Sequence, residues 1–243
     1  GGSRTRGEKG MREKGVSRLM VALDVPTRKQ ALDLASATGD CASYFKVGGR
    51  LFTAEGPDLV REIKNAGNGV FLDLKFHDIP NTVAEAAEAA TGLGVDFCDV
   101  HASGGTEMMK AAVEASKEEA SRLGIAAPRI LAITVLTSMR STVDEVLALA
   151  ERAMDAGVDG VVSSAWEAKA IREALGRDFL IVTPGIRPAW AAKNDQRRVA
   201  TPEVAIANGA DFIVVGRPIT KAESPAAAAQ MIQDAMAPAE VPL

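Results

Sequence analysis

The chain has 243 residues, enough for one large domain or two small ones, and its content of 47% hydrophobic and 25% charged residues is ordinary for a globular protein. A net charge of −4, with no stripe of Lys and Arg among aromatic residues, argues against a nucleic-acid-binding protein. No apolar run approaches the roughly 18 residues of a membrane span, and no secretory signal is recognisable, so we expect a cytoplasmic protein that does not bind membranes.

Apolar runs of strand length alternate with amphipathic runs of helix length from Arg18 onward, with Gly, Pro and Asp at the junctions. Strands are predicted at residues 19–23, 44–47, 70–74, 96–100, 130–136, 160–163, 179–182 and 212–215. Helices are predicted to begin near Thr27, Thr53, Asn81, Thr106, Ser141, Trp166, Thr201 and Ser224. Several of these starts place Ser, Thr or Asn before acidic residues, as helix N-caps do.

Eight strand-then-helix units predict a (β/α)8 TIM barrel, because most of the strands are apolar on both faces. An open doubly wound sheet is the alternative, but it normally has a Gly-rich turn after the first strand, and residues 23–26 have none. Residues 1–17 are expected to be a disordered leader or an expression remnant, and residues 18–243 a single catalytic domain. Cys41 and Cys98 lack the spacing of a metal site or a disulfide and are predicted to be buried free thiols of a protein in a reducing compartment.

Polar residues gather at the predicted C-terminal ends of the strands, where barrels of this kind carry their chemistry. These ends hold Asp24, Lys46 with Gly48, Asp73 with Lys75, His101, Thr137 with Ser138, Ser163 with Ser164, Pro184 to Arg187, and Gly216 with Arg217. Fold and chemistry therefore point to the same edge of the sheet. The two histidines, His77 and His101, are interpreted as structural.

The segment 71–82 is the most informative, because Asp73 and Lys75 lie two residues apart in an apolar strand and should share one face. Burying both charges is costly, so the pair indicates a working site. With Lys46 before them and Asp78 after them, these residues make an alternating series of charges: Lys, Asp, Lys and Asp. The flanking carboxylates favour a charged Lys75 and therefore a general acid. A magnesium site on Asp73 and Asp78 is the alternative, although two lysines would compete with the ion.

The ends of the seventh and eighth strands combine Gly with Arg, at Gly185 and Arg187 and again at Gly216 and Arg217. Barrels commonly bind phosphate at these positions, because Gly lets backbone N–H groups approach the anion and Arg supplies a bidentate cation. The polar segment 188–199 between them is either a lid over this site or an ordinary surface loop.

Eight motifs together resemble bacterial orotidine 5'-phosphate decarboxylases, from Arg18 to the last helix. They are Ala22 to Asp24, Phe45 to Gly48, Asp73 to Thr82, Val100 to Gly105, Thr134 to Met139, Thr183 to Arg187, Asp195 to Arg198, and Val215 to Thr220. The resemblance implies a lyase without a cofactor, which converts orotidine 5'-phosphate to uridine 5'-phosphate and carbon dioxide in pyrimidine biosynthesis. It also implies a homodimer with shared active sites.

The resemblance assigns a role to particular residues of this sequence. Lys75 would donate a proton to C6 of the pyrimidine, Asp73 would lie beside the departing carboxylate, and Lys46 and Asp24 would contact the ribose. Asp78 and Thr82 would serve the site of the partner subunit. Thr137 and Ser138 would contact the base, and Arg187, Gln196, Gly216 and Arg217 would form the phosphate site and its lid. Ile79 and Pro184 are further implied substrate-binding residues.

Two other functions are compatible with parts of the sequence. A magnesium-dependent sugar-phosphate decarboxylase or aldolase of the same barrel type shares the array of Asp73, Lys75 and Asp78, but residues 78–82 and 195–198 favour the nucleotide enzyme. A barrel that only binds a nucleotide or a partner would not need the complete charged set.

Overall fold

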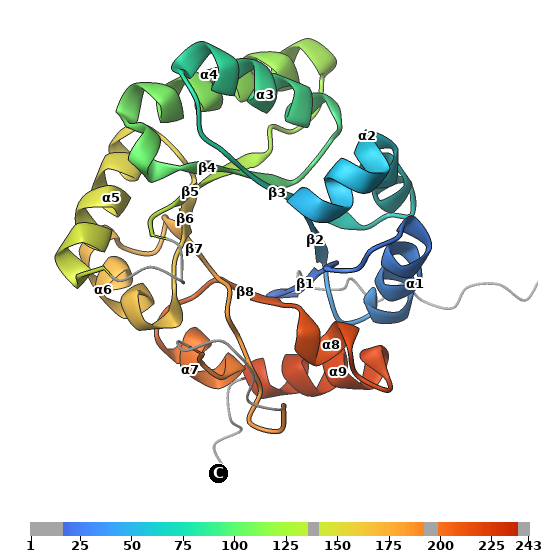
Figure 1. The fold of residues 1–243 in the computed structure, drawn as a ribbon. Helices are drawn as coiled ribbons and strands as arrows, with labels where there is room; N and C mark the ends of the chain where they lie inside the picture. The colour runs from blue at the N-terminus through green and yellow to red at the C-terminus, as the bar shows by residue number, and fades with distance from the viewer. Residues whose placement is uncertain (1–16, 136–140, 192–198, 238–243) are drawn as a thin grey trace, which may run out of the picture.

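The computed structural model describes residues 17–135, 141–191 and 199–237, and these form the predicted barrel. Within them, eight parallel strands pair in sequence order, and β8 pairs with β1 to close the ring shown in Figure 1. The strands are β1 (Leu19–Ala22), β2 (Tyr44–Gly48), β3 (Gly69–Phe76), β4 (Phe97–His101), β5 (Arg129–Ile133), β6 (Gly160–Val162), β7 (Leu180–Thr183) and β8 (Phe212–Val215). The open-sheet alternative is therefore wrong.

Helices surround the ring of strands in the same figure. They are α1 (Arg28–Thr38), α2 (Gly49–Asn65), α3 (Pro80–Gly92), α4 (Thr106–Leu123), α5 (Val143–Asp155), α6 (Ala165–Leu175), α7 (Pro202–Ala207), α8 (Arg217–Thr220) and α9 (Pro225–Met236), with a short 3-10 turn at Ala102–Gly104. Among the described residues, no helix is both long enough and apolar enough to span a bilayer.

Alternate residues of each strand face two different cores. In β1, Leu19 and Val21 pack outward against the helices, whereas Met20 and Ala22 face the inside of the barrel. The interior near the N-terminal ends of the strands contains aromatic side chains, and the rings of Tyr44 and Phe97 are in edge-to-face contact there, with 4.9 Å between their centroids. This apolar plug fills the barrel below the C-terminal ends of the strands.

Helix starts follow the N-cap signals in the sequence. Thr27, Thr201 and Ser224 each accept a hydrogen bond from the backbone of the first helical turn, as expected. The helix expected near Ser141 is capped one residue later, because Thr142 and Glu145 form a reciprocal capping box. Both cysteines are buried free thiols, as predicted.

Three expectations about the elements were wrong, and one helix was not predicted. Helix α2 begins at Gly49 rather than near Thr53. It is interrupted at Gly56, which has a φ of 70° and lies directly before Pro57. Strand β5 ends at Ile133, where its pairing with β6 stops. Strand β3 continues to Phe76, two residues beyond the predicted end. The helix α8 was not predicted, because four residues are too few to show a helical period of apolar residues.

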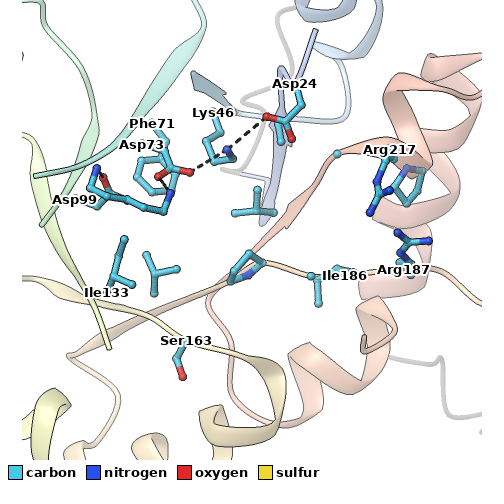
Figure 2. A pocket seen from close by; sticks show the side chains of 18 of the residues that line it. Asp24, Lys46, Phe71, Asp73, Asp99, Ile133, Ser163, Ile186, Arg187 and Arg217 are labelled. Carbon is cyan, nitrogen blue, oxygen red and sulfur yellow. Dashed lines mark hydrogen bonds and ion pairs between the residues drawn. The ribbon is translucent and has the colours of Figure 1, made fainter. Parts of the chain in front are cut away.

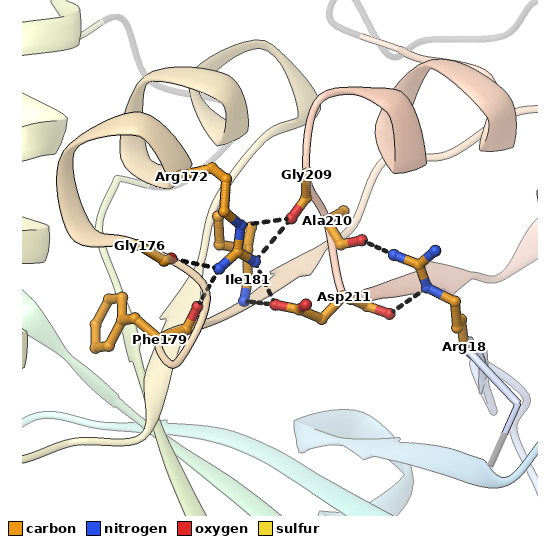
Figure 3. Close-up of polar contacts among 8 residues, drawn as sticks. All are labelled: Arg18, Arg172, Gly176, Phe179, Ile181, Gly209, Ala210 and Asp211. Atoms are coloured by element: carbon orange, nitrogen blue, oxygen red, sulfur yellow. Dashed lines mark hydrogen bonds and ion pairs between the residues drawn. The ribbon is translucent and has the colours of Figure 1, made fainter.

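Arg172 of α6 joins the N-terminal ends of β7 and β8 from outside the barrel (Figure 3). Its guanidinium donates to the carbonyl oxygens of Gly176, Phe179 and Gly209 and to Oδ2 of Asp211 at 2.5 Å. The same carboxylate oxygen accepts the backbone N–H of Ile181 at 2.8 Å. Four acceptor groups thus share one largely buried cation, which makes it a clamp on the closure of the barrel.

We expect Arg172→Ala to lower the free energy of unfolding by about 2–4 kcal/mol, because it removes the charged donor shared by three carbonyl groups and the Asp211 carboxylate. The measurement is urea denaturation followed by circular dichroism. Lys169→Ala on the same helix is the control, since its pair with Glu173 spans 3.9 Å and is exposed, and it should change stability by less than about 0.5 kcal/mol. Equal urea midpoints for the two variants would show that Arg172 is not a clamp.

Candidate active site

A cavity of about 250 Å³ opens at the C-terminal ends of the strands, above the aromatic plug. Its wall includes nine polar or glycine residues from seven strand ends: Asp24, Lys46, Asp73, Lys75, Asp99, Ser163, Gly185, Arg187 and Gly216, together with Arg217 of α8. This is the edge of the barrel at which the sequence predicted a site. The size is sufficient for a small ligand and the lining is strongly charged.

Charges of alternating sign line one side of the cavity, as Figure 2 shows. Lys46 Nζ lies 3.7 Å from Asp24 Oδ1 and 2.9 Å from Asp73 Oδ2. The other oxygen of Asp73 is paired with the ammonium of Lys75. Four of the predicted residues, from β2, β3 and the loop after β1, therefore form one continuous array.

The array depends on an irregularity in β3. The register with β4 shifts between Leu72 and Phe76, and Lys75 has a φ of 53°, in the left-handed region that non-glycine residues seldom adopt. Lys75 is the one non-glycine residue with positive φ among the described residues. Such conformations cost free energy and gather at functional sites. The alternation of side chains in a strand predicted that Asp73 and Lys75 would share one face. Their side chains are indeed paired, although the strand is not regular.

The charge state of Asp73 follows from its neighbours. Burial opposes the ionisation of Asp73. Three neighbours outweigh this effect and lower the pKa of Asp73 to about 2: the positive charge of Lys46, a hydrogen bond with Asp99, and the charge and hydrogen bond of Lys75. Burial likewise opposes the charge on Lys46, whereas Asp73 and Asp24 raise the pKa of Lys46 above its usual value. At neutral pH the centre of the array is therefore a carboxylate held by ammonium groups.

Asp99 is a member of the site that the sequence analysis missed. It lies on β4 with 1% of its surface exposed, its Oδ1 accepts the backbone N–H of Lys75 at 2.8 Å, and its carboxyl is hydrogen-bonded to Asp73. A signal was present, because Asp99 follows Phe97 by two residues inside a buried strand, as Asp73 follows Phe71.

The opposite part of the cavity carries the two predicted arginines. Figure 2 places the side chains of Arg187 and Arg217 together, across the pocket from Asp73. A Cβ atom at Gly216 would lie 3.2 Å from Asp24 Oδ2, so glycine avoids a close contact with Asp24 at this part of the cavity wall. The backbone N–H of Arg187 donates to the carbonyl oxygen of Ala200 at 2.9 Å. This bond holds together the two residues that flank the segment 188–199, the predicted lid or surface loop. An anion with three oxygens suits such a pair of guanidinium groups.

Comparisons with known proteins agree with this geometry. Residues 17–232 match the family described as Orotidine 5'-phosphate decarboxylase / HUMPS family. An orotidine 5'-phosphate decarboxylase of Syntrophomonas wolfei is 50% identical over 228 residues, which cover 88% of this chain and 95% of the relative. This chain belongs to the orotidine 5'-phosphate decarboxylase / HUMPS family.

Other members of the family support the same placement. The orotidine 5'-phosphate decarboxylase of Moorella thermoacetica is 50% identical over 227 residues, covering 88% of this chain and 90% of the relative. The crystal structure of the Lactobacillus acidophilus enzyme of that name superposes with a TM-score of 0.79 at 40% identity, over 90% of this chain and 98% of the other. The predicted family and fold are confirmed.

Some residues that the family resemblance suggested are not in the cavity wall. Asp78, Ile79 and Thr82 are exposed beyond the end of β3, and Ile79 is 65% exposed. Asp78 Oδ1 accepts the backbone N–H of Ile79 at 2.6 Å. Three further residues, Thr137, Ser138 and Gln196, lie outside the described residues. Pro184 lines the cavity.

Two histidines and one serine are the remaining polar groups at the strand ends. The rings of His77 and His101 lie 5.1 Å apart between centroids, and burial, His77 and Lys75 lower the pKa of His101. Ser163 lines the cavity, and its hydroxyl has no hydrogen-bond partner among the described residues. In the same part of the chain, no group of three or more His, Cys, Asp or Glu side chains is arranged to hold a metal ion.

Proposed function

We propose that the protein decarboxylates orotidine 5'-phosphate to uridine 5'-phosphate and carbon dioxide, a step of pyrimidine biosynthesis. The observation that carries this proposal is the array of Asp24, Lys46, Asp73 and Lys75 along one wall of a cavity whose opposite end holds Arg187 and Arg217. Membership of the family and relatives of that name at 50% identity support it.

Loss of carbon dioxide from C6 of the pyrimidine leaves an electron pair on that carbon. With no cofactor in the proposed reaction to delocalise the pair, fixed positive charge at the carbon must stabilise it as it forms. The ammonium of Lys75 is held in the cavity by Asp73 and can supply this charge and then the proton. Asp73 would lie beside the departing carboxylate.

The phosphate and ribose would position the reacting ring. Arg187, Arg217 and Gly216 would hold the phosphate, and Asp24 and Lys46 the ribose hydroxyl groups, with Pro184 in the wall between them. Binding energy from the phosphate can then be used to orient C6 against Lys75. The three assigned residues outside the described part of the chain, Thr137, Ser138 and Gln196, would contact the base and close over the phosphate.

The exposed residues at the end of β3 are best explained by a second copy of the chain. Asp78 and Thr82 lie outside the cavity of their own subunit, and the large apolar side chain of Ile79 beside them is mostly exposed. We therefore include in the proposal a homodimer in which these residues complete the site of the partner subunit.

The principal test is the change in ultraviolet absorbance when orotidine 5'-phosphate is added to the protein in excess chelator. We expect rapid turnover, and Lys75→Ala should reduce it by at least about 10²-fold, because the proton donor is lost, while uridine 5'-phosphate still binds in calorimetry. Lys169→Ala makes the same change at an exposed position and should turn over normally. No reaction with folded protein would refute the proposal, and a reaction restored by magnesium with sugar phosphates would favour the other lyase.

Arg217→Ala should lower kcat/KM by about 10- to 150-fold, since hydrogen bonds to a charged phosphate are worth about 1.5–3 kcal/mol. Steady-state kinetics on the same substrate measure this effect. Arg177→Ala is the matched control, because Arg177 is exposed between α6 and β7 and does not line the cavity. Unchanged kinetics in Arg217→Ala would refute the phosphate assignment.

Mixing Asp78→Asn with Lys75→Ala subunits tests the shared site. Each variant alone should be inactive, whereas a mixed dimer has one site with both residues intact, so random exchange should restore about one quarter of the wild-type rate. Native mass spectrometry verifies the exchange. If mixed dimers form and the activity stays absent, Asp78 acts within its own subunit or not at all.

A further inference from the structure

We propose that Asp99 is a positioning residue that works as a neutral carboxylic acid, accepting the backbone N–H of Lys75 on one oxygen and donating its proton to Asp73. This role deepens the proposed function and rests on it, because it concerns the geometry of the proton donor. Asp99 is distinct from the four residues of the charged array, and its side chain need not touch the substrate.

The position of Asp99 supports this assignment. It lies inside the barrel on β4, beside β3 on one side and opposite Leu131 of β5 on the other, with 1% of its surface exposed. Figure 2 shows its side chain next to that of Asp73, at the base of the array. Asp99 has two partners: its Oδ1 accepts the backbone N–H of Lys75 at 2.8 Å, and its carboxyl contacts the carboxyl of Asp73.

Two carboxyl groups in contact inside a protein cannot both be ionised cheaply. Asp73 takes the charge, because the ammonium groups of Lys46 and Lys75 both pair with it. Burial and Asp73 raise the pKa of Asp99 well above its usual range, against the weaker opposing effect of Lys75. Of the two carboxyl groups, Asp99 is therefore the one that holds the proton in the proposed arrangement.

Few other ionisable groups face Asp99. β3 contributes Asp73 and Lys75, and β2 contributes the more distant Lys46. On its own strand the neighbours are Cys98, whose pKa is raised by burial, and the partly buried His101. The side facing β5 is apolar, with Leu131 and Ile133. None of these competes with Asp73 for the Asp99 proton.

The two hydrogen bonds have separate consequences. The bond to the backbone N–H stabilises the left-handed conformation of Lys75, which sets the direction of its side chain. The bond donated to Asp73 helps keep that carboxylate ionised and fixed between the two lysines. Removing Asp99 should thus loosen the proton donor without affecting the arginine end of the cavity.

Asp99→Asn tests the neutral state directly, because an amide keeps the acceptor oxygen and replaces the donor O–H by N–H. We expect its kcat to stay within about threefold of wild type, whereas Asp99→Ala should lose at least about tenfold in kcat. Uridine 5'-phosphate should bind both variants as it binds wild type. A kcat of Asp99→Asn as low as that of Asp99→Ala would overturn the proposal, and so would an unchanged kcat in Asp99→Ala.

The pH dependence of stability is an independent readout. An acid with a raised folded-state pKa loses its proton only on unfolding, so wild-type stability falls as pH rises above the unfolded pKa of about 4. Asparagine lacks this slope. The margin, defined as the melting temperature of Asp99→Asn minus that of wild type, should therefore increase from pH 5 to pH 8. A constant or reversed margin would mean that Asp99 is ionised.

Infrared difference spectra of wild type minus Asp99→Asn complete the test without any substrate. A protonated carboxyl band at neutral pH supports the proposal, and a carboxylate band in its place overturns it. This result and the melting curves hold even if the wild-type protein fails to decarboxylate orotidine 5'-phosphate, so failure of the proposed function and failure of the Asp99 assignment are separate outcomes. Asp99→Asn also keeps the test decisive if Asp99→Ala does not fold.

Discussion

The buried carboxylate of Asp73 is the constraint on which the site depends. An ion with about a tenth of its side chain exposed is tolerated because Lys46 and Lys75 pair with its two oxygens. Removing one partner of such a pair typically costs about 3–5 kcal/mol, since it leaves an uncompensated charge. Every other member of the array is positioned relative to this group, and the array would not form on a flexible segment.

The barrel supplies the rigidity that this arrangement requires. On β3 and β4 the inward-facing residues are aromatic in the layer nearer the N-terminal ends of the strands and charged in the next layer, as in the pairs Phe71 and Asp73 or Phe97 and Asp99. The aromatic layer excludes water from below, and strand pairing fixes the backbone of the charged layer. Positive charge arranged before the reaction then needs little reorganisation as negative charge develops, which suits decarboxylation without a cofactor.

A purely regular barrel would not give this site. The shift of register in β3 and the left-handed backbone at Lys75 depart from ideal strand geometry. Such a departure persists only where the surroundings enforce it, and here the carboxyl of Asp99 on the next strand contacts the Lys75 backbone. Local irregularity and a long-range contact are therefore parts of one feature, which links the fold to the orientation of Lys75.

Much of this protein was determined by the sequence alone. Repeated apolar runs and helix caps specified eight βα units, and charges placed inside otherwise apolar runs identified Lys46, Asp73 and Lys75, because such charges are too costly to bury without a purpose. The tertiary structure decided what local patterns cannot encode. It brought Asp99 from 24 residues away against Lys75, placed both arginines across the cavity, and left Asp78 outside it. These outcomes depend on strand register and closure, which arise only when distant segments pair.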